Sequence, residues 1–264
     1  PFARDIRSPA PAQPLRKLFQ DHFPAWKTIG VSLATTKTEA VPSTYPIIKI
    51  GDARQDVDLL RLVEENMPQL QNSLFVGASG LTRALAQVLC DQAPAPVCKV
   101  SVKGGNILFV VGSLARETDE QVKTLCRTRA VKLFDSADDT LFDQSHLKKL
   151  FQQDETNIIV LKTPDHNLLS TSSAAESILD ALSESVEKII GSIKVSVIVA
   201  TGGDTAQAIL AKLDVKNLFV LGEISPGVVF AMIDSPANNF YIVTKAGGFG
   251  EPELFMNIID YFSD

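Results

Sequence analysis

From residue 107 onward, short apolar runs of strand type alternate with segments of helical periodicity, and this alternation limits the possible folds more than any other feature. Runs such as residues 107–111, 157–162 and 195–200 are almost continuously apolar, which is typical of strands buried on both faces. Strands that alternate with amphipathic helices predict an α/β fold with a mainly parallel sheet covered by helices on both faces. The last three predicted strands, which begin at residue 218, follow one another without helices, so this part of the sheet is expected to be antiparallel.

The first part of the chain predicts a smaller α/β portion of its own. Short runs of strand type, of which residues 73–76 are the last, alternate there with short helical segments. Residues 93–103 are rich in proline and small side chains, a composition typical of the connection between two domains. The sequence therefore predicts one domain over residues 1–95 and a second domain over residues 96–264.

Composition and charge narrow the classes of partner. The 264 residues carry a net charge of −6, which argues against nucleic acid as the main partner because such proteins usually present a basic patch. A nucleotide ligand needs only local amide donors and stays compatible with this charge. No run approaches the roughly 18–20 apolar residues of a membrane span. The three cysteines are sparse and unclustered, so we expect a reducing, cytoplasmic location and no metal site.

The sharpest motif is VSVIVATGGDTAQAILAKL at residues 195–213, where an apolar strand runs through two glycines into a helix. Adjacent glycines allow a tight turn and let the backbone approach a ligand closely. The amides of Gly203, Asp204 and Thr205 would then lie at a helix N-terminus, where free N–H groups and the helix dipole favour an anion. The alternative is an ordinary strand-to-helix turn with Asp204 as the N-cap. The motif alone leaves both interpretations open.

A second motif, IVTKAGGFG at residues 242–250, places Lys245 and three glycines at the end of a strand. A lysine beside a pliable backbone is suited to neutralising a phosphoryl group during transfer. The alternative is a glycine-rich connector with an exposed lysine, although Phe249 would then have to be packed inside the turn. A third motif, GEISPG at residues 222–227, predicts a turn at the end of a strand with a structural role.

Three turns, two of them from these motifs and one at Gly112-Ser113, are expected at one edge of the sheet. Gly112-Ser113, Gly202-Gly203 and the residues after Lys245 each follow a predicted strand, and ligands of open α/β sheets bind at the carboxyl ends of the strands. The GxxxxGK[ST] pattern of a P-loop and the GxGxxG pattern of a dinucleotide site are both absent from the sequence. The turns therefore predict a phosphate-binding site of another kind, unless they are purely structural parts of an unrelated α/β protein.

Four motifs follow one another in the C-terminal part of the chain: VGSLARETDEQ at 111–121, TGGDTA at 201–206, GEISPG at 222–227 and TKAGGFG at 244–250. Through these motifs the chain resembles the four-carbon acid sugar kinase family, whose members phosphorylate threonate, erythronate or 3-oxo-tetronate with ATP. The resemblance implies a set of ATP contacts from Ser113, Gly202, Gly203, Asp204, Thr205, Gly247 and Gly248. It also implies that Lys245 is a catalytic phosphate partner and that Mg²⁺ accompanies ATP.

The N-terminal part resembles the end of the family's sugar-acid-binding domain. Its matching motifs are PFARD at 1–5, GDARQDVDLL at 51–60 and FVGASGL at 75–81, and the resemblance implies that Arg4 and Asp5 face the sugar acid. The acidic DDxTGA motif with which family members begin is absent. We therefore expect a chain that is truncated relative to the family, and a general base that belongs to the missing region. Asp52, Asp56 and Asp58 are predicted to cap a helix instead.

Two functions from different classes follow from the resemblance. The first is an ATP-dependent carbohydrate-acid kinase that transfers a phosphoryl group to a hydroxyl of a small acid sugar. The alternative is a nucleotide-binding module without catalytic activity, because the acidic motif is absent. ATP and the acid sugar are the expected partners, with no nucleic acid and no membrane, and a homo-oligomer is left open.

Overall fold

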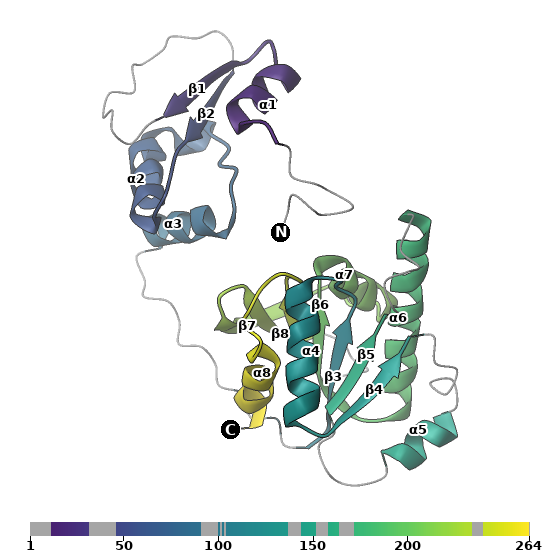
Figure 1. The fold of residues 1–264 in the computed structure, drawn as a ribbon. Helices are drawn as coiled ribbons and strands as arrows, with labels where there is room; N and C mark the ends of the chain where they lie inside the picture. The colour runs from purple at the N-terminus through teal and green to yellow at the C-terminus, as the bar shows by residue number, and fades with distance from the viewer. Residues whose placement is uncertain are drawn as a thin grey trace. The chain divides into compact units, whose positions relative to one another are not determined.

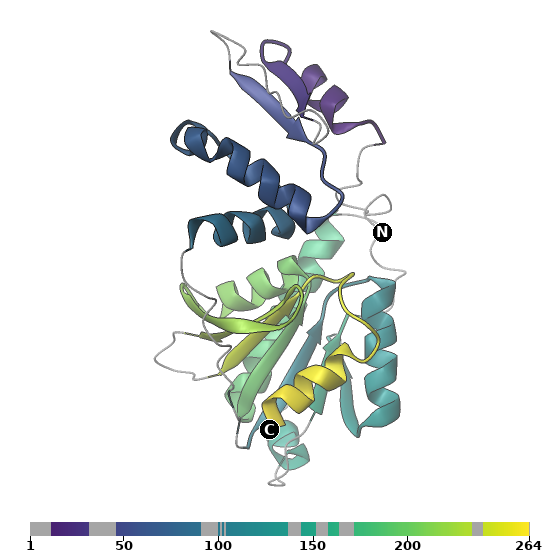
Figure 2. The same ribbon diagram turned by 90° about the vertical axis from the view of Figure 1, so that its left-hand side faces the viewer.

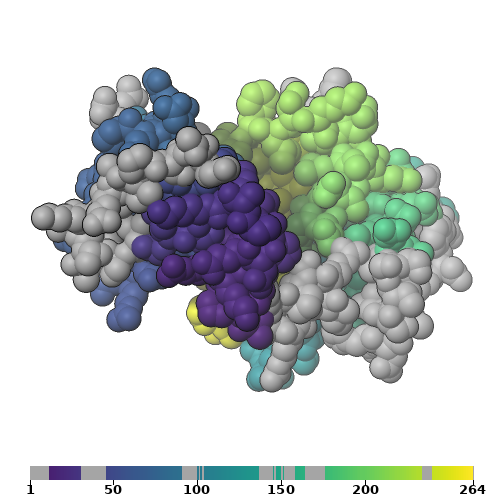
Figure 3. All heavy atoms as spheres, turned by 90° about the horizontal axis from the view of Figure 1, so that it is seen from above, coloured from purple at the N-terminus to yellow at the C-terminus, as the bar shows by residue number. Residues whose placement is uncertain are grey.

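The chain divides into two compact units in a computed structural model. They are an N-terminal unit, Pro1–Ala95, and a C-terminal unit, Pro96–Asp264. The residues that the structure describes are coloured in Figure 1 and in the space-filling view of Figure 3, and comprise 12–31, 46–90, 100, 102, 104–136, 144–151, 158–163, 172–233 and 240–263. Within these ranges, none of the helices has the length and apolar character that crossing a bilayer requires.

A seven-stranded sheet forms the centre of the described part of the C-terminal unit, with the strand order β4-β5-β3-β6-β9-β8-β7. Its strands are β3 (Asn106–Val111), β4 (Val131–Asp135), β5 (Ile158–Lys162), β6 (Val195–Thr201), β7 (Leu218–Ser225), β8 (Val228–Ile233) and β9 (Tyr241–Lys245). The pairs from β4 to β9 are parallel, and β8 and β7 join them in antiparallel pairs. The prediction of a mainly parallel sheet with an antiparallel part is confirmed.

Helices cover both faces of this sheet because its central strands are apolar on both faces. Leu108 and Val110 of β3 belong to a core cluster with residues of α5 (Gln144–Leu150), α6 (Ser172–Ser192) and α7 (Gly203–Lys212). The alternate β3 residue Phe109 belongs to a second cluster with residues of α4 (Arg116–Thr128) and α8 (Leu254–Ser263). Figure 2 shows α4 and α8 on one side of the sheet and α7 on the other. A strand buried on both faces reads as one continuous apolar run, and β3 is such a strand.

The N-terminal unit contains a two-stranded parallel sheet and short helices. Its elements are α1 (Leu15–His22), β1 (Lys27–Val31), β2 (Ile47–Gly51), α2 (Asp56–Asn66), the 3₁₀ helix η2 (Met67–Asn72) and α3 (Ser79–Leu89). At the start of α2, a carboxylate oxygen of Asp58 accepts hydrogen bonds from the backbone amides of Arg54 and Gln55, at 2.9 and 3.0 Å. The bond from Gln55, the N-cap residue, is half of a capping box, so the predicted capping role is confirmed for Asp58.

The strand predicted at residues 73–76 is wrong. This segment has no regular secondary structure, and the side chains of Leu74 and Val76 are 88% and 79% exposed. A strand needs a neighbour that pairs with its backbone N–H and C=O groups, and in the described part of this unit the only ladder is that of β1 with β2. Apolar and β-branched side chains alone do not supply that pairing.

Candidate functional site

The carboxyl ends of β3, β6 and β9 lie side by side at one edge of the sheet. These three strands are parallel neighbours, and their registers place Val111 opposite Thr201 and Thr201 opposite Lys245. The chain leaves the three strands through Gly112-Ser113, Gly202-Gly203 and Ala246-Gly247. Three predicted turns that are far apart in the sequence are thus brought together at the carboxyl ends of parallel strands, which is where ligands of open α/β sheets bind.

The three loops pack against one another so closely that glycine is needed at two positions. A Cβ atom at Gly247 would collide with the hydroxyl of Ser113, and a Cβ atom at Gly112 would collide with the hydroxyl of Thr205. Ser113 also accepts a hydrogen bond from the amide of Ala115, at 3.2 Å, ahead of α4. The Thr205 side chain is almost fully buried. Each hydroxyl therefore lies against the backbone of a neighbouring loop, and the loops form one connected structure.

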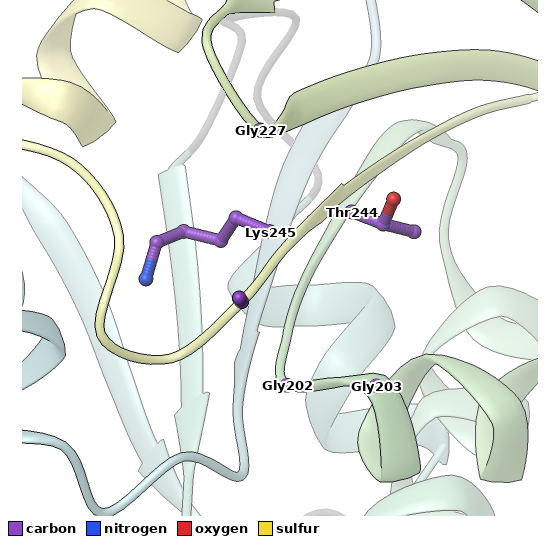
Figure 4. Close-up of a pocket in the computed structure, with 6 residues that line it drawn as sticks. Gly202, Gly203, Gly227, Thr244 and Lys245 are labelled. Atoms are coloured by element: carbon purple, nitrogen blue, oxygen red, sulfur yellow. The ribbon is translucent and has the colours of Figure 1, made fainter. Parts of the chain in front are cut away.

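A hollow of about 190 Å³ opens beside these loops (Figure 4). It is lined by Gly202, Gly203, Gly227, Thr244, Lys245 and Ala246. Pockets for whole small molecules usually measure about 300–1,000 Å³, so this hollow has room for only part of a nucleotide. Glycine backbone forms much of its wall, and a ligand can therefore come close to main-chain amides.

The turn between β6 and α7 presents the N-terminus of a helix to this hollow. Gly202 is the N-cap, with φ 97° and ψ 140°, and its amide donates to the carbonyl of Lys245 at 2.8 Å. The helix begins at Gly203, so the amides of Gly203 and Thr205 have no helical carbonyl one turn earlier as an acceptor. Asp204 is the second residue of the helix, and the alternative in which Asp204 is the N-cap is wrong. A φ this positive is open to glycine and costly for other residues, which explains the cap.

Lys245 is buried, with only 3% of its side chain exposed, so the alternative of an exposed lysine on a connector is wrong. Its ammonium donates to the hydroxyl of Thr118 and to the carbonyl of Gly247, both at 3.1 Å. Burial lowers the pKa of Lys245 to about 8, and the nearby Glu117 carboxylate partly opposes this shift. In Figure 4 the side chain extends from β9 away from Gly202 and Gly203.

Two side chains of α4 bind the loop after β9. Both belong to the motif at 111–121, and the sequence analysis assigned neither of them a role of its own. The hydroxyl of Thr118 donates to the carbonyl of Gly247 at 2.7 Å. The amide nitrogen of Gln121 donates to the carbonyls of Phe249, Gly250 and Glu251, at 3.0, 2.9 and 3.2 Å. Both side chains are fully buried.

A signal for these two residues was present in the sequence. Thr118, Gln121 and Leu125 share one face of a helix, because residues three and four apart lie on the same side. They are the buried residues of α4. Polar residues on the core-facing stripe of a helix need partners, and here the partners are carbonyls of the glycine-rich loop.

The turn between β7 and β8 borders the hollow, although residues 222–227 were predicted to have a structural role. Gly227 lines the hollow with φ 78°, and a Cβ atom there would collide with the ring of Phe249. The antiparallel register places Val228 opposite Lys245, which brings this turn to the end of β9. Phe249 packs over Gly227 and stays 40% exposed, so it covers the turn from outside.

The predicted site residues thus differ in their placement. Ser113, Gly202, Gly203, Thr205 and Gly247 meet at the three strand ends. Gly248 follows Gly247 and is exposed. Arg4 and Asp5 lie outside the described residues. Among the described residues, no group of three or more His, Cys, Asp or Glu side chains is arranged to hold a metal ion.

Comparisons with known proteins show which sequences this chain is similar to. Residues 108–255 match a family described as the nucleotide-binding C-terminal domain. The chain is 24% identical over 294 residues to D-threonate kinase of Salmonella typhimurium, a match that covers 100% of this chain and 67% of the relative. It is 27% identical over 224 residues to D-threonate kinase of Bordetella bronchiseptica, with coverage of 82% and 52%.

A solved structure shows the same fold. The Haemophilus influenzae protein HI1011, of the DUF1537 family, matches with a TM-score of 0.66 and 18% identity, over 99% of this chain and 66% of that one. This chain therefore spans about half to two thirds of the length of the proteins that it matches. The family match contains all three strand-end loops.

Proposed function

This chain belongs to the four-carbon acid sugar kinase family through its nucleotide-binding C-terminal domain, and on this premise we propose that it acts in phosphoryl transfer from ATP to a hydroxyl of a small acid sugar. The observation that carries the proposal is the meeting of three glycine-containing loops and a helix N-terminus at adjacent strand ends. The C-terminal unit is proposed to bind ATP. Residues 1–95 are proposed to contribute part of the sugar-acid site.

The phosphates of ATP are proposed to bind at the first turn of α7. The amides of Gly203 and Thr205 belong to that turn, and a helix N-terminus favours an anion through its N–H groups and its dipole. Ser113 lies on one side of the turn, and Gly247 and Gly248 follow the end of β9. Because glycine leaves the backbone uncovered, the nucleotide can approach these loops directly.

Backbone amides at this place also suit the reaction. Phosphoryl transfer places charge on the oxygens of the transferred group, and fixed donors that face those oxygens lower the barrier. Mg²⁺ is proposed to arrive bound to ATP and to neutralise phosphate charge. The described residues contain no acidic cluster for the ion, so we assign it no protein ligands. Asp204, in the first turn of α7, stays a predicted nucleotide contact.

The acid sugar is proposed to be of the four-carbon class, and the relatives named D-threonate kinase make D-threonate the first acid to test. Erythronate and 3-oxo-tetronate are the other candidates. The predicted contacts from Arg4 and Asp5 belong to this part of the proposal. A homo-oligomer also stays a prediction, for which sedimentation of the chain is the test.

Two measurements on the full 264-residue chain test the proposal. Calorimetry with ATP and with a non-hydrolysable analogue measures binding, and a radiolabel transfer assay across the four-carbon acids measures chemistry. We expect the chain to bind both nucleotides, and we expect transfer of label to one acid when the assayed protein also carries a DDxTGA-type segment as the source of the general base. Binding without transfer to any acid would favour the nucleotide-binding module over the kinase. A chain that binds neither nucleotide would contradict both functions, and Gly203→Val serves as the control that loses binding.

A further inference from the structure

The loop after β9 is held from one side by three buried donors. The ammonium of Lys245 and the hydroxyl of Thr118 both donate to the carbonyl of Gly247, at 3.1 and 2.7 Å. The same ammonium donates to the Thr118 hydroxyl at 3.1 Å. Lys245, Thr118 and the Gly247 carbonyl therefore form a closed triangle of hydrogen bonds. Further along, Gln121 donates to the Phe249 and Gly250 carbonyls.

These bonds leave little of the Lys245 ammonium for a phosphate. An ammonium group has three N–H donors, and two of them are directed to Thr118 and Gly247. The side chain is 3% exposed and extends away from Gly202 and Gly203 (Figure 4). The ring of Phe255 lies 5.9 Å from the ammonium, at a separation that favours a cation over an aromatic face. The Lys245 ammonium is therefore bound mainly to neighbouring groups of the protein.

The direction of a carbonyl fixes the direction of the next amide. In a planar trans peptide the C=O of one residue and the N–H of the following residue point in opposite directions. Because the Gly247 carbonyl is directed to α4, the Gly248 amide is directed away from α4, and the same holds for the Phe249 carbonyl and the Gly250 amide. Neither amide has a protein acceptor within the described part of the chain.

A glycine-rich loop does not keep this orientation by itself. Gly247 and Gly248 have no side chains to restrict rotation, and glycine loses more conformational freedom on ordering than any other residue. A rotated 247–248 peptide would turn its carbonyl oxygen outward, where it would repel an anion. The bonds to the Gly247 carbonyl prevent that rotation.

We propose that Lys245 is a positioning residue: acting with Thr118 on the Gly247 carbonyl, it fixes the 247–248 peptide so that the Gly248 amide is presented to the phosphates of the nucleotide. This inference rests on the proposed nucleotide function. It replaces the direct phosphate contact predicted for Lys245 with an indirect role. It also assigns a function to Thr118, which reaches the loop from a helix 129 residues earlier in the chain.

Four variants of the full chain test this role. Lys245→Met removes the ammonium and keeps a long side chain, and Thr118→Val removes the hydroxyl and keeps the shape. Thr118→Ser keeps the hydroxyl. Lys132→Met is the matched control, because Lys132 lies on β4, two strands away from β3 in the sheet, with its ammonium over the Phe151 ring. The measurements are the Kd for ATP, kcat, and the NMR order parameter of the Gly248 amide without nucleotide.

We expect Lys245→Met and Thr118→Val to raise the Kd for ATP by about tenfold each, while kcat changes by less than about threefold, as for loss of uniform binding. The double variant should be no weaker than the weaker single variant, because both act on one carbonyl. The Gly248 order parameter should fall from about 0.85 toward 0.6 or below in both single variants. Thr118→Ser and Lys132→Met should behave as the unmodified chain.

Two results would overturn the inference. One is a large loss of kcat in Lys245→Met with none in Thr118→Val, since Lys245 would then touch the transferred group. The other is an unchanged Gly248 order parameter in both variants. The order parameter is measured without nucleotide, so it decides the positioning role even for a chain that binds no ATP. Absence of ATP binding in the unmodified chain would instead count against the proposed function.

Discussion

Replacing Gly202 and Gly203 by alanine, one at a time, separates backbone strain from ligand space in the turn between β6 and α7. Gly202 has φ 97° and ψ 140°, and the nearest atoms to an added Cβ lie 3.6 and 4.0 Å away. The cost of Gly202→Ala is therefore conformational strain rather than collision, and a residue held in such a region costs about 1–3 kcal/mol. We expect Gly202→Ala to lower the free energy of unfolding by about 2 kcal/mol.

Gly203→Ala adds the same methyl group one residue later without that strain. Gly203 is helical, and no atom lies within 4 Å of an added Cβ. Alanine is favoured over glycine in a helix by up to about 1 kcal/mol, so the free energy of unfolding should stay equal or rise slightly. The methyl group would stand at the wall of the hollow, where the backbone is proposed to meet a phosphate. A tenfold loss of ATP affinity, about 1.4 kcal/mol, is the expected minimum.

Urea unfolding and calorimetry with ATP measure the two effects on the same samples. We expect Gly202→Ala to lower the free energy of unfolding, whereas Gly203→Ala should lower the affinity for ATP and keep its stability. Unchanged ATP affinity in Gly203→Ala would refute the ligand interpretation of the turn. Unchanged stability in Gly202→Ala would refute the strain argument.

Three further substitutions have defined outcomes. The folded-state pKa of Lys245, about 8, lies below its ordinary value of 10.5. Between these two pH values the unfolded chain binds one more proton than the folded chain, so the free energy of unfolding rises with pH. In denaturant titrations, Lys245→Met should lack about 2 kcal/mol of this rise between pH 8 and pH 10. Gln121→Met removes a donor shared by three carbonyls and should lower the free energy of unfolding by about 2 kcal/mol, measured in urea. Gly227→Ala places a side chain at a positive φ and against the Phe249 ring, so it should lower the free energy of unfolding by about 2 kcal/mol or more. Adding Phe249→Ala should not restore full stability, because the backbone strain at φ 78° remains.

Most of the C-terminal fold was accessible from the sequence because burial on two faces leaves a simple pattern. Strands β3 and β6 lie in the middle of the sheet, and each is buried along its whole length and almost continuously apolar. The segment at 73–76 has similar residues, yet it is not a strand. The difference lies in pairing, which depends on neighbours that no local pattern contains.

The glycine turns of the candidate site were also accessible, because each glycine pair follows an apolar strand. The contacts from α4 were not, because Thr118 and Gln121 act on carbonyls 128 to 130 residues away in the sequence. The face of the sheet toward which the Lys245 side chain points was not accessible from the sequence either. Side chains alternate along a strand, so Thr244 and Lys245 lie on opposite sides of β9 (Figure 4), and only the packed helices decide which side faces α4.

A titration of ATP into the isotope-labelled chain, followed by NMR at the backbone amides of Ser113, Gly203 and Gly248, tests most directly whether the three strand-end loops bind nucleotide. We expect the three amide signals to shift together with a single Kd, in the range of about 1 μM to 1 mM that is usual for enzyme substrates. Signals that stay unchanged up to several-fold above that range, or that shift only in other parts of the chain, would contradict it.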